Sequence, residues 1–128
     1  MCPTPTAPAG GVSDGQPLVD MGRFAHEAVA VDPATGCVYE TEDAGDTSGF
    51  YRFVANDPGR LSEGGRLHML AIAGFPQADT RTGQTGEPRP VEWVDIAEPD
   101  PADVLTNRVF FQGFAQGGAR FRRLEGAF

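Results

Sequence analysis

Along residues 22–43, apolar and polar positions alternate in the way that is typical of two strands joined by a tight turn. Val29 and Val31 would share one face of the first strand. The turn at 32–36 contains a proline, which presets φ, and a glycine, which accepts a positive φ. A return strand then begins at 37–39. This stretch therefore predicts a β-hairpin, and a hairpin brings its first and last residues together.

Three later stretches are rich in β-prone residues, and we expect a strand in each of them, at 50–54, 66–72 and 90–96. Residues 17–21 are expected to form a short strand or an extended entry into the hairpin. Residues 74–89 contain glycine, proline and threonine at a density typical of a long surface loop.

One helix is expected over 104–116. Asp103 would cap its start, and Val109, Phe110 and Phe114 would form its apolar stripe. The two glycines at 117 and 118 would end it. A final extended run is expected over 119–125.

Short strands with local antiparallel connections favour a meander, which is the unit of a propeller blade. We expect a mostly all-β chain, namely an antiparallel β-meander that forms one to two blades of a β-propeller with one short helix. Residues 1–17 are expected to be a disordered, low-complexity lead, and 18–128 a partial propeller domain. Because the last residues look like the middle of an element, we expect an incomplete fold.

The net charge of −8 argues against nucleic acid as a partner, because phosphate neutralisation needs clustered basic residues. The ten basic residues are all arginine. No apolar run is long enough for a membrane span, and the first residues contain no secretory signal pattern. The localisation is therefore left unknown. Neither Cys2 nor Cys37 has the spacing of a zinc ligand.

The predicted hairpin carries acidic residues at both of its ends. Glu27 stands where it begins and Glu42 and Asp43 stand where it ends, with His26 beside them. Carboxylates gathered in this way raise one another's pKa unless a cation compensates, and they suit a hard cation. The alternative from geometry alone is a solvated strand end beside a histidine that only packs.

Four segments together resemble the PhoX-type alkaline phosphatase family. They read, in order, GRFAHEAVAVDPATGCVYETED, SGFYRFV, PGRLSEGGRLHML and FRRLEG. The resemblance runs from about residue 21 to residue 128. It implies a β-propeller, an iron and calcium cluster (Ca²⁺ and Fe³⁺) on the propeller axis, and hydrolysis of phosphate monoesters.

The resemblance also implies roles for particular residues. Glu27 would be a metal ligand, and the acidic pair after the return strand would supply another, Asp43 in preference to Glu42. Arg123 would bind the phosphate of the substrate and Glu125 would bind metal. His26 would support the ligands rather than bind metal itself.

This sequence departs from the family pattern in its first part. The family uses a cysteine iron ligand and an asparagine before the GRFAHE motif, and neither Cys2 nor Cys37 stands in a matching position. We therefore expect a fragment that carries part of the site, lacks the remaining propeller blades and is inactive alone. The alternatives are a non-catalytic binding module and a truncated gene product without function. Family members are commonly exported, and the identity of the substrate is left open.

Overall fold

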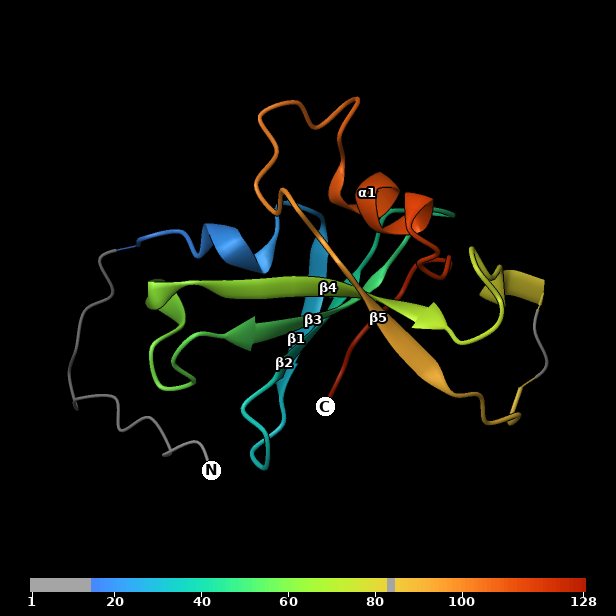
Figure 1. Cartoon of the computed structure of the whole chain (residues 1–128), viewed down its shortest axis with the longest axis horizontal. Coiled ribbons are helices and arrows are strands. Elements are labelled where there is room, and N and C mark those ends of the chain that lie inside the picture. Colours follow the sequence, from blue (N-terminus) through green and yellow to red (C-terminus); the bar gives the residue numbers. More distant parts are fainter. Residues whose placement is uncertain (1–14, 83–84) are drawn as a thin grey trace.

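One five-stranded antiparallel sheet forms the centre of the molecule in this computed structural model, which describes residues 15–82 and 85–128 (Figure 1). Its strands follow the chain order: β1 (His26–Val31), β2 (Val38–Glu42), β3 (Phe50–Ala55), β4 (Gly65–Ile72) and β5 (Val91–Asp95). The expected antiparallel meander with one short helix is confirmed. The sheet is open, with β1 and β5 at its edges, and its place in one or two propeller blades stays a prediction.

The helical elements are short. They are the α-helix α1 (Val109–Ala115) and the 3₁₀ turns η1 (Val19–Met21), η2 (Leu61–Glu63) and η3 (Thr80–Thr82). The expectation of a strand or extended entry at 17–21 was wrong, because η1 occupies most of that stretch. Residues 1–14 of the expected disordered lead lie outside the described residues.

The helix expected over 104–116 begins only at Val109. Asp103 accepts hydrogen bonds from the backbone N–H groups of Leu105 and Thr106 and from the Thr106 hydroxyl. These bonds close a local turn that competes with helical pairing, so residues 103–107 form a turn ahead of the helix. The expected end of the helix at the two glycines is confirmed, because the N–H groups of Gly117 and Gly118 donate to carbonyls within α1.

One face of the sheet forms the core. Leu67, Met69 and Ala71 alternate into this face along β4, and α1 and η1 pack over it. A Cβ added at Gly113 would overlap the Met69 side chain, so the glycine allows α1 to approach β4 closely. The core residues are Met21, Val38, Tyr51, Phe53, Ala55, Leu67, Met69, Ile96, Val109 and Phe110.

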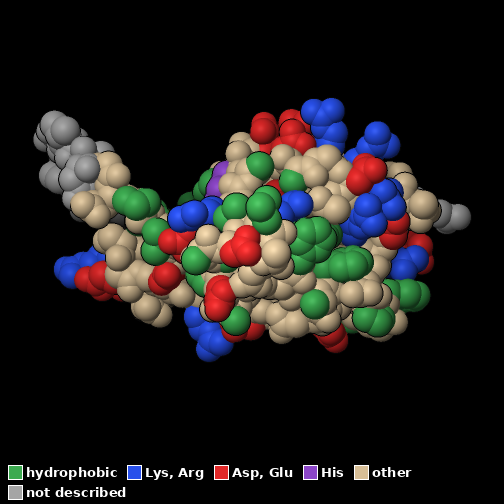
Figure 2. All heavy atoms as spheres, turned by 90° about the horizontal axis from the view of Figure 1, so that it is seen from above, with side chains coloured by type: hydrophobic (Ala, Val, Ile, Leu, Met, Phe, Trp, Pro, Cys, Tyr) green, Lys and Arg blue, Asp and Glu red, His purple; other side chains and the backbone are tan. Residues whose placement is uncertain are grey.

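The opposite face is only half buried and carries aromatic side chains. Tyr39, Phe50 and Trp93 form a cluster with ring centroids 6.1 to 6.3 Å apart. The Arg52 guanidinium lies 4.5 Å from the centre of the Trp93 ring, where a cation–π contact is favourable. Seen from above, the surface bears interspersed arginine and acidic side chains around hydrophobic patches (Figure 2).

None of the helices within 15–82 and 85–128 has the length and apolar character needed to cross a membrane.

Candidate functional site

A β-bulge lies where β1 begins. His26 pairs with Glu42 and Ala28 pairs with Thr41, so Glu27 is an additional residue between two successive pairs. A bulge bends its strand and redirects side chains, and bulges are frequent near functional sites. The Asp43 N–H donates to the Ala25 carbonyl at 3.0 Å and continues the pairing past the bulge. Glu27 and Asp43 therefore stand at the same end of the hairpin, as its pattern predicted.

The C-terminal segment passes this end of the hairpin. Phe121 exchanges two backbone hydrogen bonds with Ser48, and the Arg123 N–H donates to the Gly45 carbonyl at 2.9 Å. Further along, the Thr41 hydroxyl donates to the Glu125 carbonyl at 2.8 Å. We call the place where these segments meet the β1–β2 corner. It is defined by Glu27, Asp43, Arg123 and Glu125.

Arg123 and Asp43 form an ion pair at the corner. Arg123 Nε lies 3.5 Å from Asp43 Oδ1, and the Arg123 side chain remains 65% exposed. The backbone φ of Arg123 is +45°, in the left-handed region that residues other than glycine seldom adopt. Such strain tends to cluster at ligand sites, where the surrounding structure maintains it.

Glu42 lies next to Asp43 in sequence but points into the core. Its carboxylate accepts hydrogen bonds from the Gly49 N–H, the Tyr51 hydroxyl and Arg108 Nη2, each at 2.9 Å. Burial, reinforced by the Glu42 charge, raises the pKa of the Tyr51 hydroxyl well above its usual value. Since successive residues of a strand face opposite sides, Glu42 is enclosed while Asp43 stays accessible.

Arg108 connects α1 to the loop that follows β2. Besides the Glu42 carboxylate, its guanidinium donates to the Thr47 hydroxyl at 2.9 Å and to the Thr47 carbonyl. The guanidinium also lies over the Phe110 and Phe111 rings. Sequence reasoning missed this residue. Arg108 and Glu42 are separated by 66 positions, and nothing in either local pattern indicates that they meet.

His26 is anchored within its own segment. Its Nε2 donates to the Gly22 carbonyl at 2.8 Å, and its ring stacks on Phe24 with centroids 3.8 Å apart. Phe24 in turn stacks on the buried Tyr51 ring. The histidine thus connects the start of β1 to the core, and its role beside the ligands stays a prediction.

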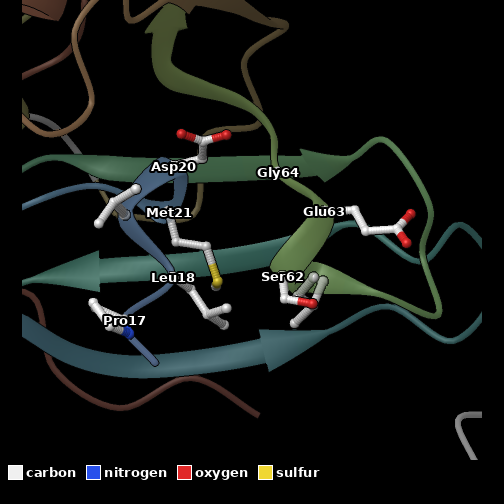
Figure 3. A pocket seen from close by; sticks show the side chains of 9 residues that line it. Pro17, Leu18, Asp20, Met21, Ser62, Glu63 and Gly64 are labelled. Carbon is white, nitrogen blue, oxygen red and sulfur yellow. The ribbon is translucent and has the colours of Figure 1, made fainter. Parts of the chain in front are cut away.

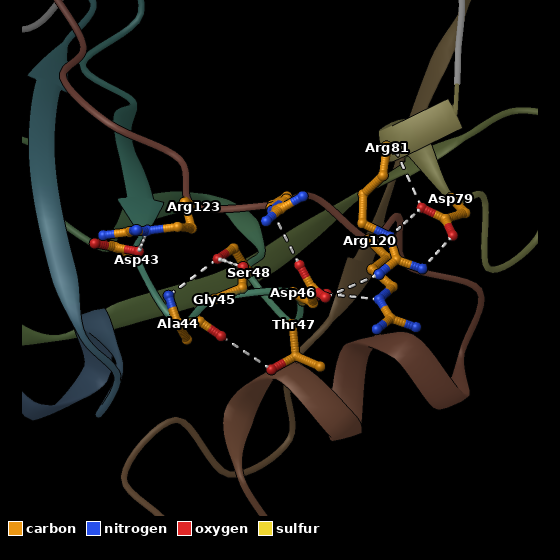
Figure 4. A network of polar contacts seen from close by, with 11 residues as sticks. Asp43, Ala44, Gly45, Asp46, Thr47, Ser48, Asp79, Arg81, Arg120 and Arg123 are labelled. Atoms are coloured by element: carbon orange, nitrogen blue, oxygen red, sulfur yellow. Dashed lines mark hydrogen bonds and ion pairs between the residues drawn. The ribbon is translucent and has the colours of Figure 1, made fainter.

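Further arginines gather beside the corner, around Asp46 (Figure 4). Arg81 Nη1 and Arg122 Nε lie 3.3 and 3.2 Å from the Asp46 carboxylate, and Arg120 Nε donates to the Asp46 carbonyl at 2.6 Å. Arg81 also holds Asp79, and its hydrogen bonds lower the pKa of that carboxyl to about 2. Guanidinium groups are thus concentrated next to Arg123, although the chain as a whole is acidic.

The carboxylates of Glu27, Asp43 and Glu125 have the donor chemistry that hard cations such as Ca²⁺ and Fe³⁺ prefer. Their backbones meet at the corner, and the side chains of Glu27 and Glu125 are exposed. Within 15–82 and 85–128, however, no three His, Cys, Asp or Glu residues are grouped closely enough to hold a metal ion. These carboxylates are the kind of ligand that a hard cation prefers, but they do not form a closed set of ligands around one point.

Two surface hollows lie elsewhere on the molecule. One, of about 240 Å³, is bounded by residues 17–21 and 61–64, so it separates η1 from η2 (Figure 3). The other follows the loop between β4 and β5 and is lined by side chains such as Phe75, Thr80 and Arg89. The corner residues line neither of these two hollows, and the side chains of Glu27, Arg123 and Glu125 are exposed.

Comparison with known proteins agrees with the resemblance drawn from the sequence motifs. A family model described as alkaline phosphatase PhoX matches residues 5–128. No curated protein and no solved structure matches the chain.

Proposed function

Because the chain belongs to the alkaline phosphatase PhoX family, we propose that its β1–β2 corner is part of a metal-dependent site that hydrolyses phosphate monoesters. The observation that carries this proposal is the meeting of three segments remote in sequence. The β1 bulge brings Glu27, the end of β2 brings Asp43, and the C-terminal segment brings Arg123 and Glu125.

The carboxylates of Glu27, Asp43 and Glu125 would hold the cation, with Ca²⁺ and Fe³⁺ as the metals that the family resemblance implies. Asp43 suits this role better than Glu42. The Glu42 carboxylate already accepts three hydrogen bonds in the core, whereas Asp43 is accessible and, among the described residues, pairs with one exposed arginine.

Arg123 would bind the phosphate. Its planar guanidinium presents paired N–H groups that match phosphate oxygens, and its exposed position leaves room for a ligand. A bound hard cation would supply charge neutralisation and would stabilise the attacking and leaving oxygens. The nearby Arg81 and Arg122 already lie beside the Asp46 carboxylate, which offsets part of their charge, so phosphate binding rests on Arg123 in this proposal.

We also propose that this polypeptide alone supplies only part of the ligand set and does not turn over a phosphate monoester. The open arrangement of the corner carboxylates supports this, since a cation held by few ligands is bound weakly. Robust hydrolysis of a chromogenic phosphate ester by the purified chain, supplied with Ca²⁺ and Fe³⁺, would contradict this part of the proposal and support the phosphatase role.

The test of the site is Ca²⁺ binding by the chain, followed by calorimetry or by NMR titration where the affinity is weak. We expect Glu27→Gln, Asp43→Asn and Glu125→Gln each to reduce the affinity. Glu92→Gln on β5, at the far edge of the sheet, removes the same charge and should change it little. Equal effects from all four variants would mean that the cation responds only to net charge, and the proposal would fail.

A further inference from the structure

One arginine differs from all the others in the chain. Each of the other arginines pairs with a carboxylate or, in the case of Arg120, donates to a backbone carbonyl. The Arg52 side chain has no hydrogen-bond or ion-pair partner among the described residues, and its Nε is enclosed without an acceptor. Leaving a buried donor unpaired costs free energy. Arg52 therefore has unused donors, in a chain whose acidic residues outnumber its basic ones.

Arg52 lies within the half-buried face of the sheet. Residues that pair across an antiparallel sheet project to the same side, and Arg52 pairs with Tyr39 on one neighbouring strand and with His68 on the other. The guanidinium lies over the Trp93 ring, which brings β5 into the same surface. We call this surface the aromatic face. It consists of Tyr39, Phe50, Arg52, Val54, Val91 and Trp93.

The composition of the aromatic face is that of a protein interface. Tryptophan, tyrosine and arginine are enriched at the energetic centres of such interfaces, and apolar contacts surround them. Val54 and Val91 are 37% and 46% exposed beside the rings, two residues along the strand from Arg52 and from Trp93. None of the six residues lines either of the two hollows described above. A broad partner therefore suits this face better than a small molecule, which needs a concave pocket.

The charges indicate what the partner carries. The nearest acid on this side of the sheet is Asp95, which pairs with His68 along the strands. Its Oδ1 lies 3.0 Å from Arg66 Nη2 and 3.7 Å from His68 Nε2, so it is already shared by two basic groups. A symmetric contact between two copies of the chain would bring this face against itself, and the arginines would meet arginines. A carboxylate from a different molecule is the complementary group.

We propose that the aromatic face docks an acidic segment of a partner protein, with a carboxylate of that segment on the Arg52 guanidinium. The planar guanidinium offers a carboxylate two parallel N–H groups, and the contact with the Trp93 ring occupies no hydrogen-bond acceptor. Apolar side chains that flank the acid would cover Val54 and Val91. This inference goes beyond the proposed function and does not depend on the β1–β2 corner.

The test begins with a library of random short peptides displayed on phage and selected against the purified chain. Trp93 is the only tryptophan, so its fluorescence reports binding at this face. We expect the enriched peptides to carry Asp or Glu between apolar residues, and synthetic copies of them to change the Trp93 emission. Replacing that acid by its amide should weaken binding by about tenfold, the effect of losing a hydrogen bond between charged groups.

Variants of the chain then locate the carboxylate. Arg52→Met keeps an apolar stem but has no donors, so it should bind the acidic peptide and its amide form equally. Arg60→Met is the matched control, since it removes an exposed arginine that pairs with Asp57 and Glu63, and it should keep the tenfold preference for the acid. The comparison of the two peptides on the unchanged chain needs no variant, so the test stands even if Arg52→Met does not fold.

Several outcomes would overturn the inference. It is wrong if the selection enriches no peptide, if the enriched peptides lack an acid, or if the acid and its amide bind the unchanged chain equally. It is also wrong if binding leaves the Trp93 emission unchanged, because the peptides then bind elsewhere. Self-association of the chain in sedimentation experiments that is lost in Arg52→Met would assign the face to a second copy instead.

Discussion

Arg123 Nε lies 3.5 Å from Asp43 Oδ1, so the side chain proposed to bind phosphate is paired with a side chain proposed to bind a cation. Each group would have to leave the other to reach its ligand. A cation that takes Asp43 would release Arg123, and a phosphate that takes Arg123 would release Asp43. Binding of the cation should therefore raise the affinity for phosphate, and binding of phosphate should raise the affinity for the cation, because the ion pair has to be broken only once.

Asp43→Asn tests this relationship. The change removes the charge that holds Arg123, so affinity for inorganic phosphate without metal should rise by about twofold to fivefold, the range of an exposed ion pair. Ca²⁺ affinity should fall in the same variant. Asp57→Asn, which alters an exposed acid beside Arg60, should change neither affinity. Phosphate binding that is unchanged in Asp43→Asn would mean that the pair does not compete with the ligand.

The positive φ of Arg123 leads to a second prediction, made by comparing Arg123→Gly with Arg123→Ala. Both changes remove the guanidinium and should abolish its contribution to phosphate binding. Glycine accepts the left-handed conformation that costs alanine about 1–2 kcal/mol, and this gain exceeds the cost of the entropy that glycine adds to the unfolded chain, so the glycine variant should be the more stable of the two to denaturant.

The neighbouring position supplies the control for this comparison. Arg122 is also exposed, but its φ is not positive. There the alanine variant should be at least as stable as the glycine variant, because glycine adds entropy to the unfolded chain. The same order of stabilities at both positions would show that the backbone of residue 123 stores no strain.

The pair formed by Glu42 and Arg108 contributes to stability in a different way, because its carboxylate is fully buried. Arg108→Met would leave that charge without its cation, and we expect a loss of about 3–5 kcal/mol in the free energy of unfolding. The double variant Glu42→Gln/Arg108→Met should recover part of the loss, which urea titration can measure. Arg60→Met removes an exposed arginine and should cost much less.

The hairpin could be predicted from the sequence because its information is local. The valines at 29 and 31 alternate with period two, and the proline and glycine of the turn fix where the chain reverses, so β1 and β2 appear where expected. The meeting of Glu27 and Asp43 then follows from antiparallel pairing alone. What the local pattern did not reveal is the bulge, which makes Glu27 the additional residue of its strand.

The supporting residues could not be predicted, because their partners are distant. Thr41 meets Glu125 across 84 positions, and neither residue stands in a pattern that indicates the other. The start of the helix was missed for a related reason. Asp103 satisfies nearby N–H groups in a turn, and Arg108, the residue before α1, is held by Glu42 and Thr47. The local turn at Asp103 and the tertiary contacts of Arg108 together decide where α1 begins.

Glu40 provides a prediction about pH. Its side chain is fully buried on β2, and neither carboxylate oxygen has a hydrogen-bond partner among the described residues. Burial raises the pKa of this carboxyl from 4.5 to about 8. Between these two pH values the folded chain keeps a proton that the unfolded chain releases. The stability associated with that proton is therefore fully present below pH 4.5 and is lost as the pH rises to about 8.

Glu40→Gln cannot release this proton, so its free energy of unfolding should fall less steeply over the same range. The difference in slope should approach about 1.4 kcal/mol per pH unit, the value for one proton. Urea titrations of both proteins at several pH values between 4.5 and 8 measure it. Val38→Ala, which removes apolar contacts from the same strand, should lower stability by the same amount at every pH. If the Glu40→Gln and wild-type curves run parallel, the Glu40 carboxyl titrates alike in the folded and unfolded chains, and its burial does not govern stability.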